Sequence, residues 1–193
     1  ESNQSYGLFA VPNPFPGEHG PRRSRGIICS RVTQSLSKAW RIKQHVKGIL
    51  NPRVLEIGAG LGRTAYYAYE LGVKDYTIVD IPMTTAAQAY YLGRTIGEEN
   101  IHLDGEQPRK LSHKIKILTP QTFFDENNTY DLILNVDSLT EMDVSVAQAY
   151  WNKIKISTSK FLSINHEANA FRVRDIFIED LNNLNIHREL YWM

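Results

Sequence analysis

The chain has 193 residues, 42% of them hydrophobic and 22% charged, which suits an ordinary globular protein with one sizeable core. The formal net charge of +1 predicts neither nucleic-acid nor membrane-surface binding. The single cysteine, Cys29, excludes an internal disulfide framework, and no apolar run reaches the roughly 20 residues that a membrane span requires. The N-terminal residues show no signal-peptide pattern, so a cytoplasmic protein is expected.

The first 50 residues differ in pattern from the rest of the chain. Residues 1–23 contain four prolines, which forbid a regular helix, so an extended arm is expected there. Residues 24–50 carry apolar residues at three- and four-residue spacings, which predicts one or two amphipathic helices. We therefore divide the chain into an N-terminal arm with a helical extension, residues 1–50, and a second domain, residues 51–193.

From residue 51 onward, predicted strands alternate with predicted helices. Strands are expected over residues 53–57, 76–79, 114–118, 130–136, 161–165 and 186–192. Helices are expected over residues 63–71, 83–96, 144–156 and 168–184. A loop is expected over residues 98–113, and residues 119–129 are too few and too polar for a full crossover helix. The alternation predicts an α/β, Rossmann-like fold with a mostly parallel central sheet flanked by helices.

The most informative segment is Val54–Arg63, where a strand runs into three glycines at alternate positions and then into a helix. Glycine lets the backbone turn sharply and lets a ligand approach without a Cβ in the way. A dinucleotide-binding turn would place its third glycine three residues after the second, whereas Gly62 follows Gly60 by two. Glu56, just before the turn, suits a cofactor that carries an ammonium and a sulfonium better than one that carries a pyrophosphate.

A carboxylate, Asp80, ends the second predicted strand, about 20 residues beyond the glycines. It can accept hydrogen bonds from both hydroxyls of a ribose, and Ile81 can pack on an adenine face. Each feature alone has a simpler explanation, because the glycines can form an ordinary turn and Asp80 can cap a helix. Strand, glycines, helix, strand and acid at this spacing together favour a nucleoside-containing cofactor.

The glycine turn resembles the first motif of class I S-adenosylmethionine (SAM)-dependent methyltransferases. Other segments resemble the sugar O-methyltransferase family: Val79–Pro82 followed by Gln88–Leu92, Asn135–Met142 and Ser163–Glu167. The resemblance covers about residues 52–170. It implies the class I methyltransferase fold, SAM as the cofactor, and transfer of a methyl group to a hydroxyl of a sugar or glycan. The predicted cofactor-binding residues are Glu56, Gly58, Ala59, Gly60, Gly62, Asp80, Ile81 and Asn135.

Methyl transfer to oxygen is helped by a base that removes the hydroxyl proton. His166 follows the fifth predicted strand, and histidine is the side chain whose ordinary pKa lies closest to neutral pH. Asp137 and Glu141 are four residues apart, so a helix that starts near Asp137 would turn both toward one cleft. In that cleft, either carboxylate could orient His166, bind sugar hydroxyls, or bind a divalent metal together with His166. The simpler alternatives are a helix cap at Asp137, a solvated Glu141 and a His166 that bonds only to backbone. We assign all three as catalytic residues and assign no metal ligand.

Other functions stay open from the sequence. They are a methyltransferase of another small molecule, a non-catalytic SAM-binding domain, and an NAD-linked oxidoreductase, which the glycine spacing disfavours. The expected partner is a small-molecule or glycan substrate and not nucleic acid. This superfamily usually ends its sheet with a hairpin, whereas one strand is predicted here; a short sheet would leave an edge that a homodimer could cover.

Overall fold

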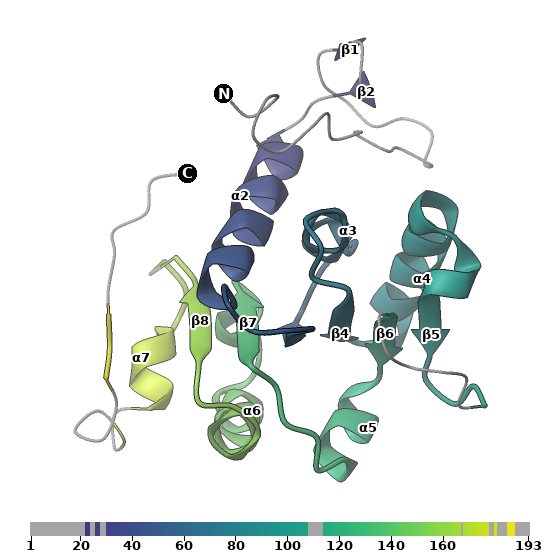
Figure 1. Cartoon of the computed structure of the whole chain (residues 1–193). Helices are drawn as coiled ribbons and strands as arrows, with labels where there is room; N and C mark the ends of the chain where they lie inside the picture. Colours follow the sequence, from purple (N-terminus) through teal and green to yellow (C-terminus); the bar gives the residue numbers. More distant parts are fainter. Residues whose placement is uncertain are drawn as a thin grey trace.

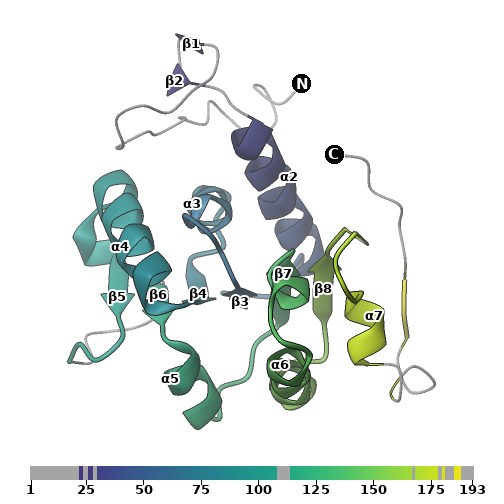
Figure 2. The same ribbon diagram turned by 180° about the vertical axis from the view of Figure 1, so that it is seen from behind.

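The computed structural model describes residues 22–23, 26–27, 30–107, 114–166, 168–177, 180 and 185–187. Strands and helices alternate along these residues, and one six-stranded sheet runs through the centre with helices on both faces (Figures 1 and 2). A separate antiparallel pair, β1 (Arg22–Arg23) with β2 (Gly26–Ile27), precedes it. Within the described ranges, no helix is long and apolar enough to cross a membrane.

The strand order of the central sheet creates a natural ligand site. The strands are β3 (Arg53–Ile57), β4 (Asp75–Val79), β5 (Ile101–Leu103), β6 (Ile115–Leu118), β7 (Leu132–Val136) and β8 (Phe161–Ile164). Their order is β5-β6-β4-β3-β7-β8, and every neighbouring pair is parallel. The chain builds outward from β3 through β4 and then crosses back to β7 on the other side of β3. The carboxyl ends of β3, β4 and β7 therefore meet at the switch point where open α/β sheets bind ligands.

The helices form one layer on each face of the sheet. The first layer holds α2 (Ser30–His45), α3 (Arg63–Glu70) and α4 (Pro82–Ile96). The second layer, on the opposite face, holds α5 (Pro120–Asp125), α6 (Val144–Ser157) and α7 (Val173–Ile176) (Figures 1 and 2). Two short 3-10 helices, η1 (Glu98–Asn100) and η2 (Leu139–Glu141), join these elements.

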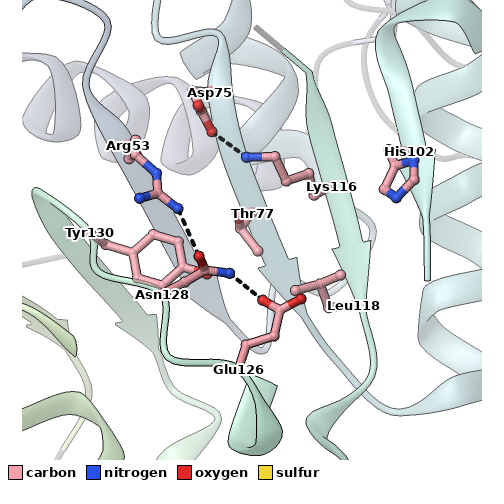
Figure 3. A pocket seen from close by; sticks show the side chains of 9 residues that line it. All are labelled: Arg53, Asp75, Thr77, His102, Lys116, Leu118, Glu126, Asn128 and Tyr130. Carbon is pink, nitrogen blue, oxygen red and sulfur yellow. Dashed lines mark hydrogen bonds and ion pairs between the residues drawn. The ribbon is translucent and has the colours of Figure 1, made fainter. Parts of the chain in front are cut away.

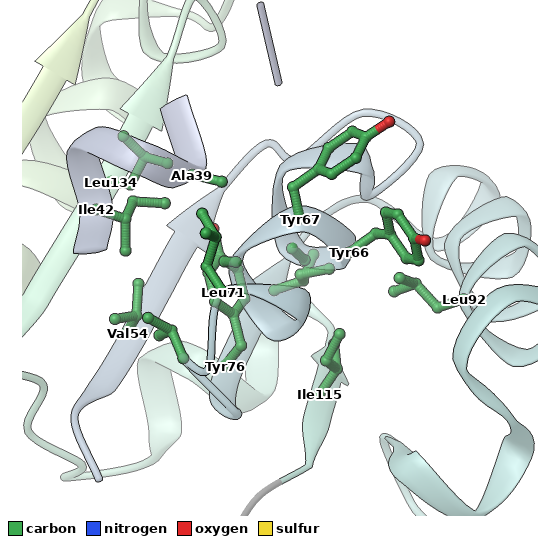
Figure 4. Packing of buried hydrophobic residues seen from close by; sticks show 14 of the residues in the cluster. Ala39, Ile42, Val54, Tyr66, Tyr67, Leu71, Tyr76, Leu92, Ile115 and Leu134 are labelled. Carbon is green, nitrogen blue, oxygen red and sulfur yellow. The ribbon is translucent and has the colours of Figure 1, made fainter. Parts of the chain in front are cut away.

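The apolar core lies in two clusters, one on each face of the sheet. In the first, Ala39 and Ile42 of α2 are fully buried and belong to the same cluster as Val54 of β3 and Leu134 of β7 (Figure 4). Helix α2 therefore contributes to the core that supports the sheet. The division of the chain after residue 50 stays a prediction.

Most elements of the second domain are confirmed. The strand predicted over residues 53–57 is β3, and the helix predicted over residues 83–96 is α4, which begins one residue earlier at Pro82. In the described part of residues 24–50, the predicted helical stretch forms one helix, α2. The connection over residues 119–129 holds α5, of only six residues, as its length and polarity predicted.

The prediction of a loop over residues 98–113 is wrong for the first part of that range, because β5 lies there and pairs with β6. A three-residue edge strand is too short to show an alternating pattern, and pairing rather than propensity forms it. Of the helix predicted over residues 168–184, residues 173–176 form α7. Of the strand predicted over residues 186–192, residues 186 and 187 are described and neither is in a strand; the others lie outside the described residues.

Candidate cofactor and active site

The turn after β3 is tied to its neighbours on both sides. The Gly58 N–H donates to the Val79 carbonyl oxygen at 2.9 Å, which joins the turn to the end of β4. A Cβ added to Gly58 would overlap Ser138, in the loop after β7. A Cβ added to Gly62 would lie 3.2 Å from Leu92 Cδ1 of α4. Two of the three glycines are therefore needed because other parts of the chain pack directly against them.

Gly60 differs from the other two glycines. Its φ is 55°, a left-handed conformation that side chains with a Cβ rarely adopt. A Cβ built on it would meet nothing within 4 Å in the part of the chain that is described. The outer face of the turn at Gly60 is thus open backbone, which is the surface a ligand can approach most closely.

Asp80 lies beside this open face. Its Oδ1 accepts the Ile81 N–H at 2.9 Å, and its Oδ2 accepts Gln88 Nε2 at 2.8 Å. The same Gln88 Nε2 donates to the Gly60 carbonyl oxygen at 2.8 Å, so one amide group joins the carboxylate to the turn. Burial raises the pKa of Asp80, while the bonds from Ile81 and Gln88 lower it, as do the N–H groups of Ala59 and Gly60.

The alternative role for Asp80, a helix cap, is not what the structure shows. The N-cap residue of α4 is Ile81, and among the described residues no side chain caps that helix end. The Ile81 side chain is 60% exposed, so an apolar surface lies next to the carboxylate and is open to a ligand. Gln88 was not predicted as a site residue, because nothing local to α4 indicates that residue 88 reaches the turn at residue 60.

Glu56 lies under the turn rather than on its open face. It is 2% exposed, and Tyr76 Oη donates to its Oε2 at 2.9 Å. Burial raises the pKa of the Glu56 carboxyl to about 7, against the lowering effects of the Tyr76 bond, the Lys38 charge and a bond from Thr64. The carboxylate therefore bonds Tyr76 of β4 and Thr64 of α3, and its contact with a cofactor stays a prediction.

A chain of side-chain amides joins the ends of β3, β7 and β8. Asn135 is fully buried, and its Nδ2 donates to the Ile57 carbonyl oxygen at 3.1 Å and to Ser138 Oγ at 2.5 Å. Asn165 Nδ2 in turn donates to Asn135 Oδ1 at 3.1 Å and to Ser163 Oγ at 2.7 Å. Because a carbonyl oxygen only accepts, the first bond fixes the orientation of both amides. Asn135 lies at the switch point as predicted, and Asn165 was missed.

The structure brings Asp137 and His166 together through the backbone. Asp137 Oδ1 accepts the His166 N–H at 3.2 Å, so the carboxylate holds the loop after β8 and not the imidazole ring. The exposed ring accepts the Ala168 N–H at Nδ1, at 3.3 Å. A neutral imidazole whose Nδ1 accepts carries its proton on Nε2. In this arrangement the Nε2–H of His166 can donate a hydrogen bond outward, and Nδ1 is occupied by the Ala168 N–H.

The geometry predicted for Asp137 and Glu141 is wrong. No α-helix starts near Asp137 in the described chain: Asp137 has a φ of 60°, the 3-10 helix η2 covers only Leu139–Glu141, and α6 begins at Val144. Glu141 is exposed. The described residues contain no group of three His, Cys, Asp or Glu side chains that could hold a metal ion, and Glu167 lies outside them. Asp137 is therefore the carboxylate that the fold connects to His166.

A cavity of about 310 Å³ lies elsewhere, on the face of the sheet that carries α5 (Figure 3). Lys116 Nζ bonds Asp75 Oδ1 there at 2.6 Å, and Arg53 Nη2 donates to Asn128 Oδ1 at 3.4 Å. Lys116 and Asp75 thus form an ion pair, whereas Arg53 bonds a neutral amide. We attribute the cavity to the short β6–β7 connection, which leaves part of a polar sheet face without a long helix over it. Its lining residues are Arg53, Asp75, Thr77, His102, Lys116, Leu118, Glu126, Asn128 and Tyr130.

Several solved methyltransferases share the arrangement of this chain. Magnesium protoporphyrin IX methyltransferase (ChlM) from Synechocystis PCC 6803, with bound SAM, is similar with a TM-score of 0.56 and 13% identity, over 79% of this chain and 69% of that one. Glycopeptide N-methyltransferase MtfA, complexed with sinefungin, has a TM-score of 0.51 and 16% identity, over 75% and 59%. Mitomycin 7-O-methyltransferase MmcR has a TM-score of 0.51 and 15% identity, over 77% and 41%.

This is the class I methyltransferase fold. No family model matches the sequence, and no curated protein matches it. At identities of 13–16% the likeness to the solved structures establishes the fold alone. The chain also spans only 59% of the length of the glycopeptide N-methyltransferase and 41% of the mitomycin 7-O-methyltransferase.

Proposed function

We propose that the chain binds SAM and transfers its methyl group to a small molecule. The observation that carries this proposal is the open backbone at Gly60 beside the Asp80 carboxylate, at the switch point of a sheet with the class I methyltransferase order. The solved relatives support it, since the glycopeptide N-methyltransferase is known in complex with sinefungin and with S-adenosylhomocysteine, and the Synechocystis enzyme with SAM.

The residues at this edge of the sheet fit an adenosyl group. Asp80 supplies a half-buried carboxylate for the two ribose hydroxyls, and exposed Ile81 supplies an apolar face for the adenine. The open turn from Gly58 to Gly62 would take the methionine part along its backbone, with Ala59 within it. Glu56 below the turn would favour the positive charge of the ligand, and buried Asn135 would support the turn from β7. Bound SAM would supply an electrophilic methyl group.

For the acceptor, we propose a hydroxyl of a sugar or glycan. The loops after β7 and β8 are rich in polar side chains, among them Asn165, whose amide bonds Asn135, and Asn169, whose Nδ2 donates to Thr140 Oγ1 at 2.6 Å. Such groups suit a polyhydroxylated molecule, whose hydroxyls both donate and accept. His166 is the proposed base, with Asp137 holding its backbone, and it would accept the hydroxyl proton at Nδ1 after the bond from the Ala168 N–H is released. A nitrogen acceptor on another small molecule is the main alternative, because the fold serves both N- and O-methyltransferases.

Two measurements, made one after the other, test the proposal. Calorimetric titration of the folded chain with SAM and with S-adenosylhomocysteine is expected to give dissociation constants in the micromolar range or tighter. Labelled SAM is then offered with a panel of sugars, nucleotide sugars and small amines. Transfer to a sugar hydroxyl supports the full proposal, and transfer only to another acceptor removes the sugar assignment. Binding without transfer to any acceptor favours a non-catalytic SAM-binding domain, and no heat with either ligand contradicts cofactor binding itself.

A further inference from the structure

Gln88 is a buried polar side chain that joins the two parts of the candidate cofactor site. It lies on α4, is fully buried, and its Nε2 donates at 2.8 Å both to the Gly60 carbonyl oxygen and to Asp80 Oδ2. Both partners only accept hydrogen bonds, so the orientation of the amide is unambiguous: the two N–H bonds point at the turn and at the carboxylate. One side chain thus sets the separation between the open backbone and the acid.

The other end of the same amide has no partner. Gln88 Oε1 is buried and accepts no hydrogen bond from the described residues. A buried acceptor without a donor is unfavourable for folding, and an apolar side chain of similar length would avoid that penalty. Packing alone therefore gives little reason for an amide at this position, whereas its two donor bonds act directly on Gly60 and Asp80.

The bond to Asp80 matters for the state of the carboxylate. Burial raises the pKa of Asp80, and the hydrogen bonds from Ile81 and Gln88 oppose that effect. These two bonds hold one oxygen each, so the plane of the carboxylate is fixed. The Asp80 side chain is only partly buried, so its exposed oxygen surface can still accept hydrogen bonds from ribose hydroxyls.

We propose that Gln88 is a positioning residue for recognition of the cofactor ribose, acting by holding the Asp80 carboxylate at a set distance from the glycine turn. The inference rests on the proposed function, since it concerns the same site. Preorganised groups bind more tightly because less ordering is left for the binding step. Loss of the Gln88 amide should therefore weaken binding of adenosyl ligands without removing any direct contact to them.

The test is a double-mutant cycle on binding of S-adenosylhomocysteine, measured by calorimetry. Gln88→Met keeps the length of the side chain but removes the amide, and Asp80→Asn removes the charge that the amide holds. Each single variant is expected to bind about 10- to 100-fold more weakly, in line with coupling between residues that share one hydrogen-bond network. The double variant is expected to bind about as weakly as Asp80→Asn alone, because Gln88 acts through Asp80.

A matched control comes from the same helix. Thr95→Val removes a hydroxyl that donates to the Tyr91 carbonyl oxygen at 2.9 Å, and it should leave the affinity unchanged. A second ligand, 2′-deoxy-S-adenosylhomocysteine, lacks one ribose hydroxyl, so Gln88→Met should weaken its binding less than that of the parent ligand. If Gln88→Met does not fold, Gln88→Asn carries the same test, since its amide is one methylene too short to make both bonds.

The outcomes separate the inference from the proposed function. If the wild-type chain binds no S-adenosylhomocysteine, the proposed function fails, and the inference falls with it. If the wild-type chain binds but folded Gln88→Met binds equally well, the inference alone is overturned. Additive losses in the double variant would also overturn it, because they would show that Gln88 does not act through Asp80.

Discussion

Tyr76 donates a hydrogen bond to Glu56 at 2.9 Å between two adjacent central strands, beneath the glycine turn. Both side chains are buried, with 0% and 2% of their surface exposed. Burial raises the pKa of the carboxyl to about 7 from an ordinary 4.5, and the same burial raises the pKa of the phenol. A buried carboxyl two residues before the glycine turn therefore changes charge near neutral pH.

The first prediction concerns the pH dependence of stability. Between pH 4.5 and about 7 the folded chain holds a proton on Glu56 that the unfolded chain has released, so this group's contribution to the free energy of unfolding falls as pH rises. The loss is complete above about pH 7 and is on the order of 3 kcal/mol. Glu56→Gln should therefore be more stable than the wild type at pH 8 and differ little from it near pH 4.5.

Denaturant unfolding of both proteins from pH 4.5 to 8.5 measures this difference, and other titrating groups cancel in the comparison. Tyr76→Phe is the companion variant. It removes a bond that lowers the pKa of Glu56, so the pKa of Glu56 should be higher in this variant. The decrease in its free energy of unfolding should therefore continue to a higher pH than in the wild type. Unfolding free energies of wild type and Glu56→Gln that run parallel across this range would contradict a titrating Glu56.

The second prediction concerns the open face of the turn. Gly60→Val should abolish binding of SAM, because a branched side chain would occupy the space that a ligand needs. Gly72→Val is the control, since Gly72 also has a positive φ, 93°, and open space around it, but lies after α3 and away from the turn. Both variants should lose some stability, and only the first should lose the ligand. Calorimetry on folded protein decides it, and normal binding by Gly60→Val would count against this site.

The third prediction compares the two ends of β4. Asp80→Ala, at the carboxyl end, should weaken SAM binding by about 1–3 kcal/mol, the range for hydrogen bonds to a charged group, and leave the fold intact. Asp75→Ala, at the other end, should leave binding unchanged but lower the unfolding free energy, because it removes the partner of partly buried Lys116. Thermal unfolding and ligand titration of both variants test the pair. An Asp80→Ala variant that binds normally would show that this carboxylate has no role in the site.

The fourth prediction concerns chemistry. His166→Ala should keep SAM affinity within a few-fold and lose about 10²–10⁴ in turnover on the true acceptor, the usual effect of removing a positioned base. Glu141→Ala should keep its turnover, because Glu141 lies in η2 and it is Asp137 that bonds the His166 backbone. Single-turnover rates with labelled SAM measure both. Full activity in His166→Ala would mean that Asp137 is the base, or that positioning of the acceptor is enough for transfer without a base. Activity that disappears with a chelator and returns with Mg²⁺ would support a metal in place of a base.

Local patterns in the amino-acid sequence were enough to predict the fold class and the strand–turn–strand unit of the candidate site. The β3 strand, the glycine turn, α3, β4 and Asp80 follow one another within a short stretch of chain, and a strand–helix–strand unit of this kind closes with one handedness. Local residue patterns are therefore enough to place the turn beside the acid. The shortened connection between β6 and β7 could be predicted for the same reason, because length and polarity are local properties.

Tertiary structure alone decided the contacts between distant segments. Gln88 reaches Gly60 from 28 residues away, and Asn165 reaches Asn135 from 30, so neither pairing has a local signal. Asp137 and Glu141 are correctly spaced for one face of an α-helix, but the chain after β7 turns at Asp137 with a φ of 60°, and only the short 3-10 helix η2 follows. Patterns along a chain report which face of an element is apolar. Which polar groups meet depends on strand order and register, and these are set by packing of the whole sheet.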